Sequence, residues 1–165
     1  APLSKNAFLD ACFNQDNSDY KGGNLNWIEA TVSKEELAWL ETDLQQTSHP
    51  TVIFTHQRLD NEDSPYGVKN GPAVRNILQQ SQVVIAVFKV TTNLGYRSIY
   101  GIHYSSLLAL VEDAGLGNKG YSTLSLHKNR HIVLEGEGAN SPSRNFIAVD
   151  RISQRLTTYL ERDQI

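Results

Sequence analysis

The chain has 165 residues, of which 39% are hydrophobic and 20% charged, and its formal net charge is −3. This length and composition are typical of one globular domain and exclude a disordered chain. The basic residues form no extended cluster of the kind that binds nucleic acid, so we expect no nucleic-acid partner. No apolar stretch approaches the roughly 18 residues that cross a bilayer, so we also expect no membrane span.

The single cysteine, Cys12, excludes an intramolecular disulfide and a cysteine-rich zinc site. Its neighbours in residues 7–13 are mostly apolar, which favours a buried structural role over a reactive thiol. The chain has no methionine, even at position 1, and we expect Ala1 to mark a processing boundary or an artificial start. The composition assigns no cellular compartment.

The chain begins with one predicted strand and one predicted helix. Residues 7–13 predict a short apolar strand, which a polar loop follows. Ser33 and Glu36 have the spacing of a capping box, which predicts a helix that begins there and ends before Pro50. The apolar residues of this helix recur at helical spacing: Leu37, Leu40 and Leu44.

The next elements continue this alternation of strands and helices. Residues 51–55 predict a buried strand that ends at His56, and a polar loop then extends to Gly71. Pro72 suits the first turn of a second helix, and residues 82–88 predict the next apolar strand. This order predicts an α/β fold in which helices are layered on a sheet.

The second half of the chain is predicted to be mostly β-structure. Residues 97–102 and 103–110 predict two strands, with Gly101 as a bend or bulge between them. Residues 121–126 and 131–135 predict a β-hairpin.

An amphipathic helix is predicted for the end of the chain, over residues 150–164. One of its faces is charged and the other is apolar. The apolar face holds Ile152, Leu156, Tyr159 and Leu160. We therefore divide the chain into a main unit over residues 1–149 and a C-terminal helix over residues 150–165.

Polar residues gather where two of the predicted strands end. In open α/β sheets, ligands bind at the C-terminal ends of the strands. His56 stands at the end of the strand at 51–55, and Asp60 lies in the loop that follows it. Imidazole and carboxylate ligands together suit a first-row metal ion. A histidine with a purely structural role is the alternative for His56.

Three charged residues near these strand ends have two interpretations each. Arg58 could contact a phosphate group and Asp60 could orient His56. Alternatively, Arg58 and Asp60 form an ion pair within the loop. Lys89, at the end of the next strand, either binds an anion or lies in solvent.

Several short segments resemble the calcineurin-like metallophosphoesterases in their order and spacing. Residues 37–40 (Leu-Ala-Trp-Leu) and 52–60 (Val-Ile-Phe-Thr-His-Gln-Arg-Leu-Asp) resemble a family helix and the strand that delivers a metal-binding histidine. Residues 84–88 and 101–104 (Gly-Ile-His-Tyr) are similar to later family elements. The resemblance extends over residues 7–138 and implies the C-terminal half of the family's αββα sandwich.

This resemblance implies His56 as a candidate metal ligand and His103 as a structural histidine. Family members hold two metal ions, so the implied cofactors are divalent Mn, Fe or Zn. The chain departs from the family, however, because it lacks the Asp-x-His, Gly-Asp and Gly-Asn-His motifs. Val90-Thr91-Thr92-Asn93 occupies the position of the Gly-His-x-His motif, which leaves Asn93 as a weak candidate ligand. The resemblance therefore implies a divalent metal ion as cofactor, and a chain that binds no metal is the alternative.

We expect a non-catalytic or incomplete metallophosphoesterase-like scaffold that serves binding or assembly. The alternative is a metal-dependent phosphoesterase or phosphodiesterase completed by another chain. An unrelated α/β domain is a third interpretation. Because half a sandwich leaves strand edges and faces uncovered, we also expect a second copy, a separate N-terminal half, or cover by the C-terminal helix.

Overall fold

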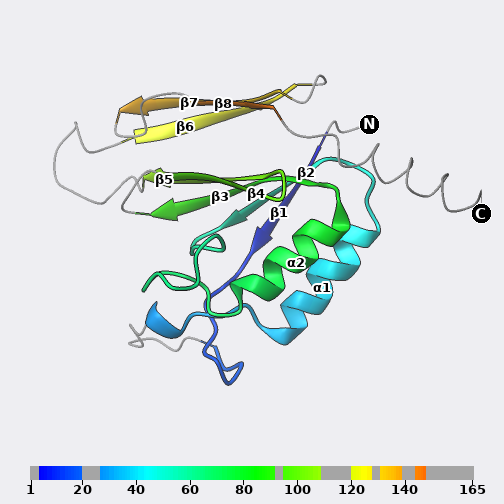
Figure 1. The fold of residues 1–165 in the computed structure, drawn as a ribbon, viewed down its shortest axis with the longest axis vertical. Coiled ribbons are helices and arrows are strands. Elements are labelled where there is room, and N and C mark those ends of the chain that lie inside the picture. Colours follow the sequence, from blue (N-terminus) through cyan, green and yellow to red (C-terminus); the bar gives the residue numbers. More distant parts are fainter. Residues whose placement is uncertain are drawn as a thin grey trace, which may run out of the picture.

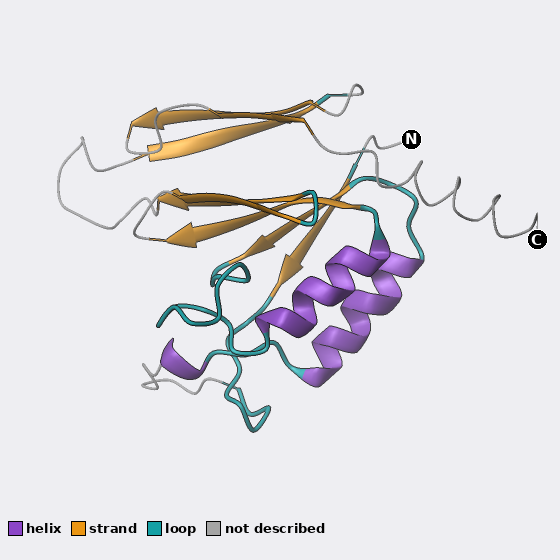
Figure 2. Ribbon diagram, in the orientation of Figure 1, coloured by secondary structure: helices purple, strands orange, loops and turns teal. Residues whose placement is uncertain are grey.

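The computed structural model describes residues 4–19, 27–91, 95–108, 120–127, 131–138 and 144–147. Helices cover one face of a five-stranded sheet, and a three-stranded sheet lies over its other face (Figure 1). Figure 2 shows the same three layers by type of structure, with α1 and α2 of the described residues on one side. No helix in the described ranges is long and apolar enough to cross a membrane.

The five-stranded sheet has the spatial order β1-β2-β3-β5-β4. Its members are β1 (Lys5–Leu9), β2 (Thr51–Thr55), β3 (Val84–Thr91), β4 (Gly95–Ile99) and β5 (Ile102–Leu108). The first three strands and β5 are parallel, whereas β4 runs antiparallel to β5. The C-terminal ends of the parallel strands therefore meet at one edge of the sheet.

The two α-helices pack on the face of this sheet that carries the larger core. They are α1 (Lys34–Gln45) and α2 (Gly71–Ser81), and a 3-10 turn, η1 (Trp27–Glu29), precedes them. Buried leucines and valines of both helices pack against buried side chains of β2 and β3, including Leu40, Leu44, Val74, Leu78, Ile53 and Val87.

The start of α1 is capped as the sequence predicted, but with one change of partner. Ser33 Oγ accepts a hydrogen bond from the Glu36 N–H at 3.1 Å, as an N-cap serine does. The Glu36 carboxylate accepts from the backbone N–H of Asp10 at 2.7 Å. Glu36 therefore joins the start of the helix to the segment that leaves β1.

The second sheet is antiparallel and covers the opposite face of the first. Its strands are β6 (Gly120–Leu126), β7 (His131–Gly138) and β8 (Arg144–Ile147), in that spatial order. Ile132 and Leu134 of β7 are buried against Val52, Ala86 and Phe88 of the five-stranded sheet. This second core holds the two sheets together.

Most predicted elements are confirmed, and the layered α/β fold with them. The strand at 51–55 has the predicted bounds, and the predicted hairpin is the β6–β7 pair. Gly101 is a turn residue with φ 74°. The strand predicted at 7–13 is wrong in its bounds, because the chain leaves the sheet after Leu9. The predicted C-terminal helix lies outside the described residues.

Candidate functional site

The ends of β2 and β3 lie side by side, as the sequence pattern led us to expect. Thr55 pairs with Lys89 in the parallel register, and Leu9 of β1 and Ser106 of β5 continue the row. β2 ends at Thr55, whereas β3 continues two residues past Lys89 to Thr91, so Lys89 lies within β3 beside the end of β2. This arrangement brings His56 and Lys89 to the same cavity.

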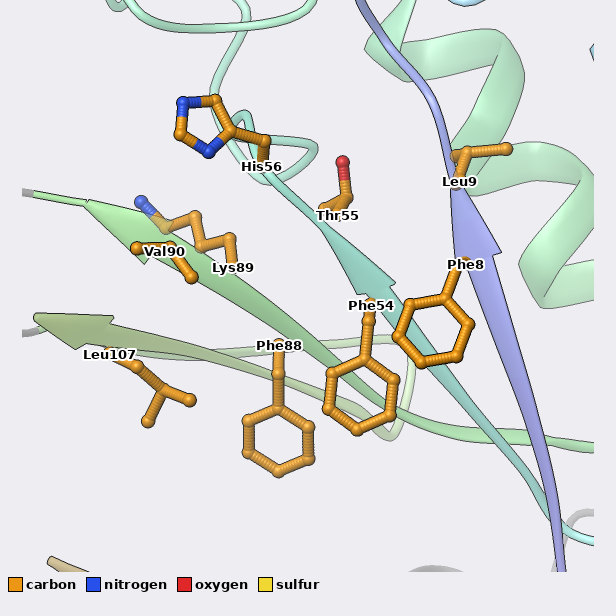
Figure 3. A pocket seen from close by; sticks show the side chains of 9 residues that line it. All are labelled: Phe8, Leu9, Phe54, Thr55, His56, Phe88, Lys89, Val90 and Leu107. Carbon is orange, nitrogen blue, oxygen red and sulfur yellow. The ribbon is translucent and has the colours of Figure 1, made fainter. Parts of the chain in front are cut away.

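The cavity at these strand ends measures about 330 Å³. Figure 3 shows the Thr55 hydroxyl, the Lys89 amino group and the His56 ring on one side of the strands. Apolar side chains line the other side, in a row from β1 to β5: Phe8, Phe54, Phe88 and Leu107. The polar and the apolar side chains that line this cavity therefore lie on opposite faces of the five-stranded sheet.

Arg58 and Asp60 form a two-pronged ion pair in the loop after β2. Arg58 Nε donates to Asp60 Oδ1 at 3.1 Å and Nη2 donates to Oδ2 at 2.8 Å. Burial raises the pKa of the Asp60 carboxyl, but the hydrogen bonds and charge of Arg58 outweigh it and hold that pKa below its usual range. The ion pair allowed by the sequence is therefore present, and a role in phosphate binding stays a prediction.

The rest of this loop is held to the body of the protein by arginine side chains. Arg97 of β4 donates to the Asp60 carbonyl at 2.9 Å. Arg75 of α2 donates to the Leu59 carbonyl at 2.7 Å and forms an ion pair with Glu62 at 2.9 Å. These bonds fix where Asp60 lies relative to β2 and β3.

Lys89 is a buried lysine, with only 6% of its surface exposed. Burial, and then the charge of Arg58, lower its pKa to about 8, although the Asp60 carboxylate acts in the opposite direction. None of the ion pairs in the described part of the chain includes Lys89. The interpretation of Lys89 as a solvated lysine is therefore wrong.

Other polar atoms near the strand ends are also buried without a partner. Among the described residues, Thr55 Oγ1 and both amide atoms of Gln57 have no hydrogen-bond partner. Such an atom costs roughly 1–3 kcal/mol when it is left unsatisfied. Thr55 lines the cavity, so a water molecule there can satisfy its hydroxyl. No sequence pattern predicts this burial, because Thr55 and Gln57 are ordinary residues for a strand end.

The remaining residues named from the sequence lie elsewhere or outside the described part. His103 of β5 is buried and lies 2.8 Å from the Tyr96 hydroxyl of β4, with Nδ1 as the contact atom. Cys12 is half-buried, and burial followed by the hydrogen bond and charge of Asp10 raises the pKa of its thiol to about 11. That value disfavours a reactive thiolate. Asn93 lies outside the described residues.

The donor atoms of the described residues at the strand ends do not fit a centre of two divalent metal ions. Within the ranges that the structure describes, no three His, Cys, Asp or Glu side chains converge to hold a metal. His56 is exposed at this cavity, and its neighbour there is the buried cation Lys89. A positive charge beside the one imidazole repels a metal ion, whereas carboxylates would attract it.

Comparison with known proteins supports the fold and leaves the chemistry open. No family model and no curated protein matches the chain. Among solved structures, it is similar to a dimetal phosphatase from Danio rerio, with a TM-score of 0.62 and 19% identity. The match covers 73% of this chain but only 40% of that protein. The chain therefore has a metallophosphoesterase-like fold and spans less than half the length of that neighbour.

Proposed function

We propose that the chain is a non-catalytic metallophosphoesterase-like scaffold that functions in binding or assembly. The observation that carries this proposal is the chemistry of the strand ends, where a buried lysine lies at the cavity that His56 also lines. A dimetal hydrolase needs several anionic and imidazole ligands around both ions. A scaffold for binding or assembly needs only the folded layers of helices and strands, without a set of metal ligands.

The open edge of β1 supports a partner that completes the sheet. In the described part of the chain β1 is an outermost strand. Its Phe8 is 73% exposed and stacks on Phe54, with 5.2 Å between the ring centres. An unpaired strand edge beside an exposed aromatic ring is a typical site for the addition of another strand. We propose a separate N-terminal half as the natural occupant.

Metal analysis of the purified chain tests the scaffold proposal. The chain is loaded with Mn, Fe or Zn, desalted and analysed for bound metal, and an activated phosphodiester is offered as substrate. We expect less than one tightly held ion per chain and no hydrolysis above the level of the His56→Ala variant. One or more tightly held ions per chain, lost in His56→Ala, would contradict the proposal.

The second candidate function is a metal-dependent phosphoesterase completed by another chain. The exposure of His56 at the cavity favours it, because an imidazole there can join ligands from a partner. The metal analysis separates the two functions once the chain is mixed with a metallophosphoesterase N-terminal half. Metal uptake and hydrolysis that appear only in the mixture would support this second function.

A further inference from the structure

We infer that the C-terminal segment, residues 150–164, docks as an amphipathic helix on the face of β1 and β2 that carries Phe8 and Phe54. The segment lies outside the described residues, and its sequence pattern predicts the helix. The proposed contact is made with the face of these strands, whereas the proposed partner strand pairs with the backbone edge of β1. It therefore goes beyond the scaffold function and requires no metal ion.

A row of aromatic rings crosses this face and is covered at one end only. Phe54 stacks on Phe8 and on Phe88, with 5.2 and 5.8 Å between the ring centres. Phe88 is buried under the second sheet in a cluster with Ile132 and Leu134. Phe8, in contrast, is 73% exposed, and Phe54 is half-buried. Figure 3 shows the three rings on one side of their strands. The described residues therefore leave the β1 end of this row in contact with solvent.

The second sheet brings the chain towards this uncovered end. β6 contacts β5, and β7 packs over β2 and β3. Because β8 lies on the other side of β7 from β6, it lies towards β2 and β1. Ile147, the last residue of β8, pairs with His131, which precedes Ile132 of the cluster that includes Val52. The chain therefore leaves the second sheet on the side of β2.

The segment is long enough to reach both rings. Phe54 lies two residues beyond Val52 on β2, which is about 7 Å along a strand. Phe8 is the partner of Phe54 on β1. Residues 148–149 can span about 7 Å when extended, and a helix over residues 150–164 is about 22 Å long. Such a helix can lie across Phe54 and Phe8 together.

The apolar side of the segment matches this uncovered surface. Its apolar residues recur at helical spacing, so a helix places them in one stripe: Ile152, Leu156, Tyr159 and Leu160. A short helix of this kind gains most of its stability from packing its apolar stripe against another surface. The connection through Ile147 keeps the segment at a high effective concentration near the rings. This connection favours the segment over a separate partner as the occupant of the face.

Hydrogen–deuterium exchange of the full chain at pH 7 tests the docked helix. We expect the amides of residues 154–164 to exchange roughly tenfold or more slowly than those of an unstructured chain. Leu156→Asp and Phe8→Ser should each remove most of this protection, because each takes away one side of the contact. Gln154→Asp is the matched control, since Gln154 falls on the opposite side of the predicted helix, and it should keep the protection.

Disulfide trapping identifies the occupant of the face. The Cys12→Ser background removes the single native thiol. In this background, Phe8→Cys combined with Leu156→Cys or with Leu160→Cys should form a disulfide within one chain on mild oxidation, because the two positions come close in the docked state. Phe8→Cys combined with Gln154→Cys should remain reduced.

Three results would overturn the inference. They are exchange of residues 154–164 at the rate of an unstructured chain, protection that Phe8→Ser leaves unchanged, and disulfides that form only between two chains. The last result would assign the face to a second copy. If Phe8→Ser fails to fold, Leu156→Asp and the trapped disulfide still decide the question. None of these results bears on the metal content that tests the scaffold proposal.

Discussion

At the scale of single residues, Lys89 is a lysine of which only 6% of the surface is exposed. It lies near the C-terminal end of the central strand β3, two residues before Thr91, where burial and the nearby Arg58 lower its pKa to about 8. Sequence alone placed Lys89 at a strand end but did not predict its burial. Burial depends on β5 and on the loop after β2, which are distant in the sequence and come together only in the fold.

Replacing Lys89 with methionine should stabilise the protein, because it removes a buried charge and keeps the side-chain length. Its folded pKa lies below the ordinary 10.5, so the cost of burial is complete below about pH 8. The cost fades as the pH rises from 8 towards 10.5. We expect Lys89→Met to raise the free energy of unfolding by about 2 kcal/mol at pH 7, a value discounted for screening by water.

Urea denaturation at pH 7 and pH 10 measures this effect. The increase in the free energy of unfolding of Lys89→Met over the parent chain should be smaller at pH 10 than at pH 7. The charged groups facing Lys89, Arg58 and Asp60, keep their charges across this range. A gain that grows between pH 8 and pH 10 would contradict the account, and Lys34→Met serves as the control.

Replacing Asp60 with asparagine should destabilise the protein, because Arg58 and Lys89 then face each other without a carboxylate. We expect a loss of about 1–3 kcal/mol at pH 7 by urea denaturation. The folded pKa of Asp60 is lowered, so its contribution is present above the ordinary 3.8 and disappears as the pH falls through the folded value. Asp63→Asn, an exposed change in the same loop, should have little effect.

At the scale of elements, local signals in the sequence predicted the regular structure well. The cap at Ser33, the proline at position 72 and the apolar run at 51–55 each gave an element close to its observed bounds. The predicted end of the first strand, at Phe13, was wrong because Phe13 forms bridges with Asp19 and Thr31 outside the main sheet. Such pairings are non-local, and no propensity of residues 10–13 indicates them.

The loop after β2 depends on a glycine that the sequence did not single out. A Cβ at Gly67 would lie 2.0 Å from the Asn61 carbonyl oxygen, which is a severe overlap with backbone. We expect Gly67→Ala to lower the free energy of unfolding by roughly 2–4 kcal/mol, measured by thermal unfolding. Gly71→Ala is the matched control, since its Cβ would lie 3.4 Å from its nearest neighbours. Equal stability of the two variants would contradict the close approach at Gly67.

At the scale of the whole molecule, the three layers form a metallophosphoesterase-like fold of limited extent. The family resemblance of short motifs predicted this fold, and the dimetal phosphatase from Danio rerio confirms it at the level of architecture. The candidate site was harder to predict. Its position at the ends of β2 and β3 followed from strand order, whereas the orphaned atoms around Thr55 depend on packing that sequence patterns do not encode.

In the described part of the chain, β1 is an outermost strand of its sheet. Our proposal that a partner strand pairs with this edge predicts that a second copy can occupy it beside Phe8. Phe8→Lys should shift the chain towards the monomer in sedimentation velocity, because a lysine on an edge strand opposes strand addition. Tyr66→Lys, at an exposed aromatic residue of the loop after β2, is the control. Equal association of the parent and both variants would count against the β1 edge.

Anomalous diffraction from crystals grown with excess Mn²⁺ tests the central claim most directly, that the described residues cannot hold a dimetal centre. We expect no pair of Mn peaks at the ends of β2 and β3, where Lys89 supplies the positive charge. Two peaks a few ångströms apart, coordinated by His56 and other side chains of this chain, would contradict the account.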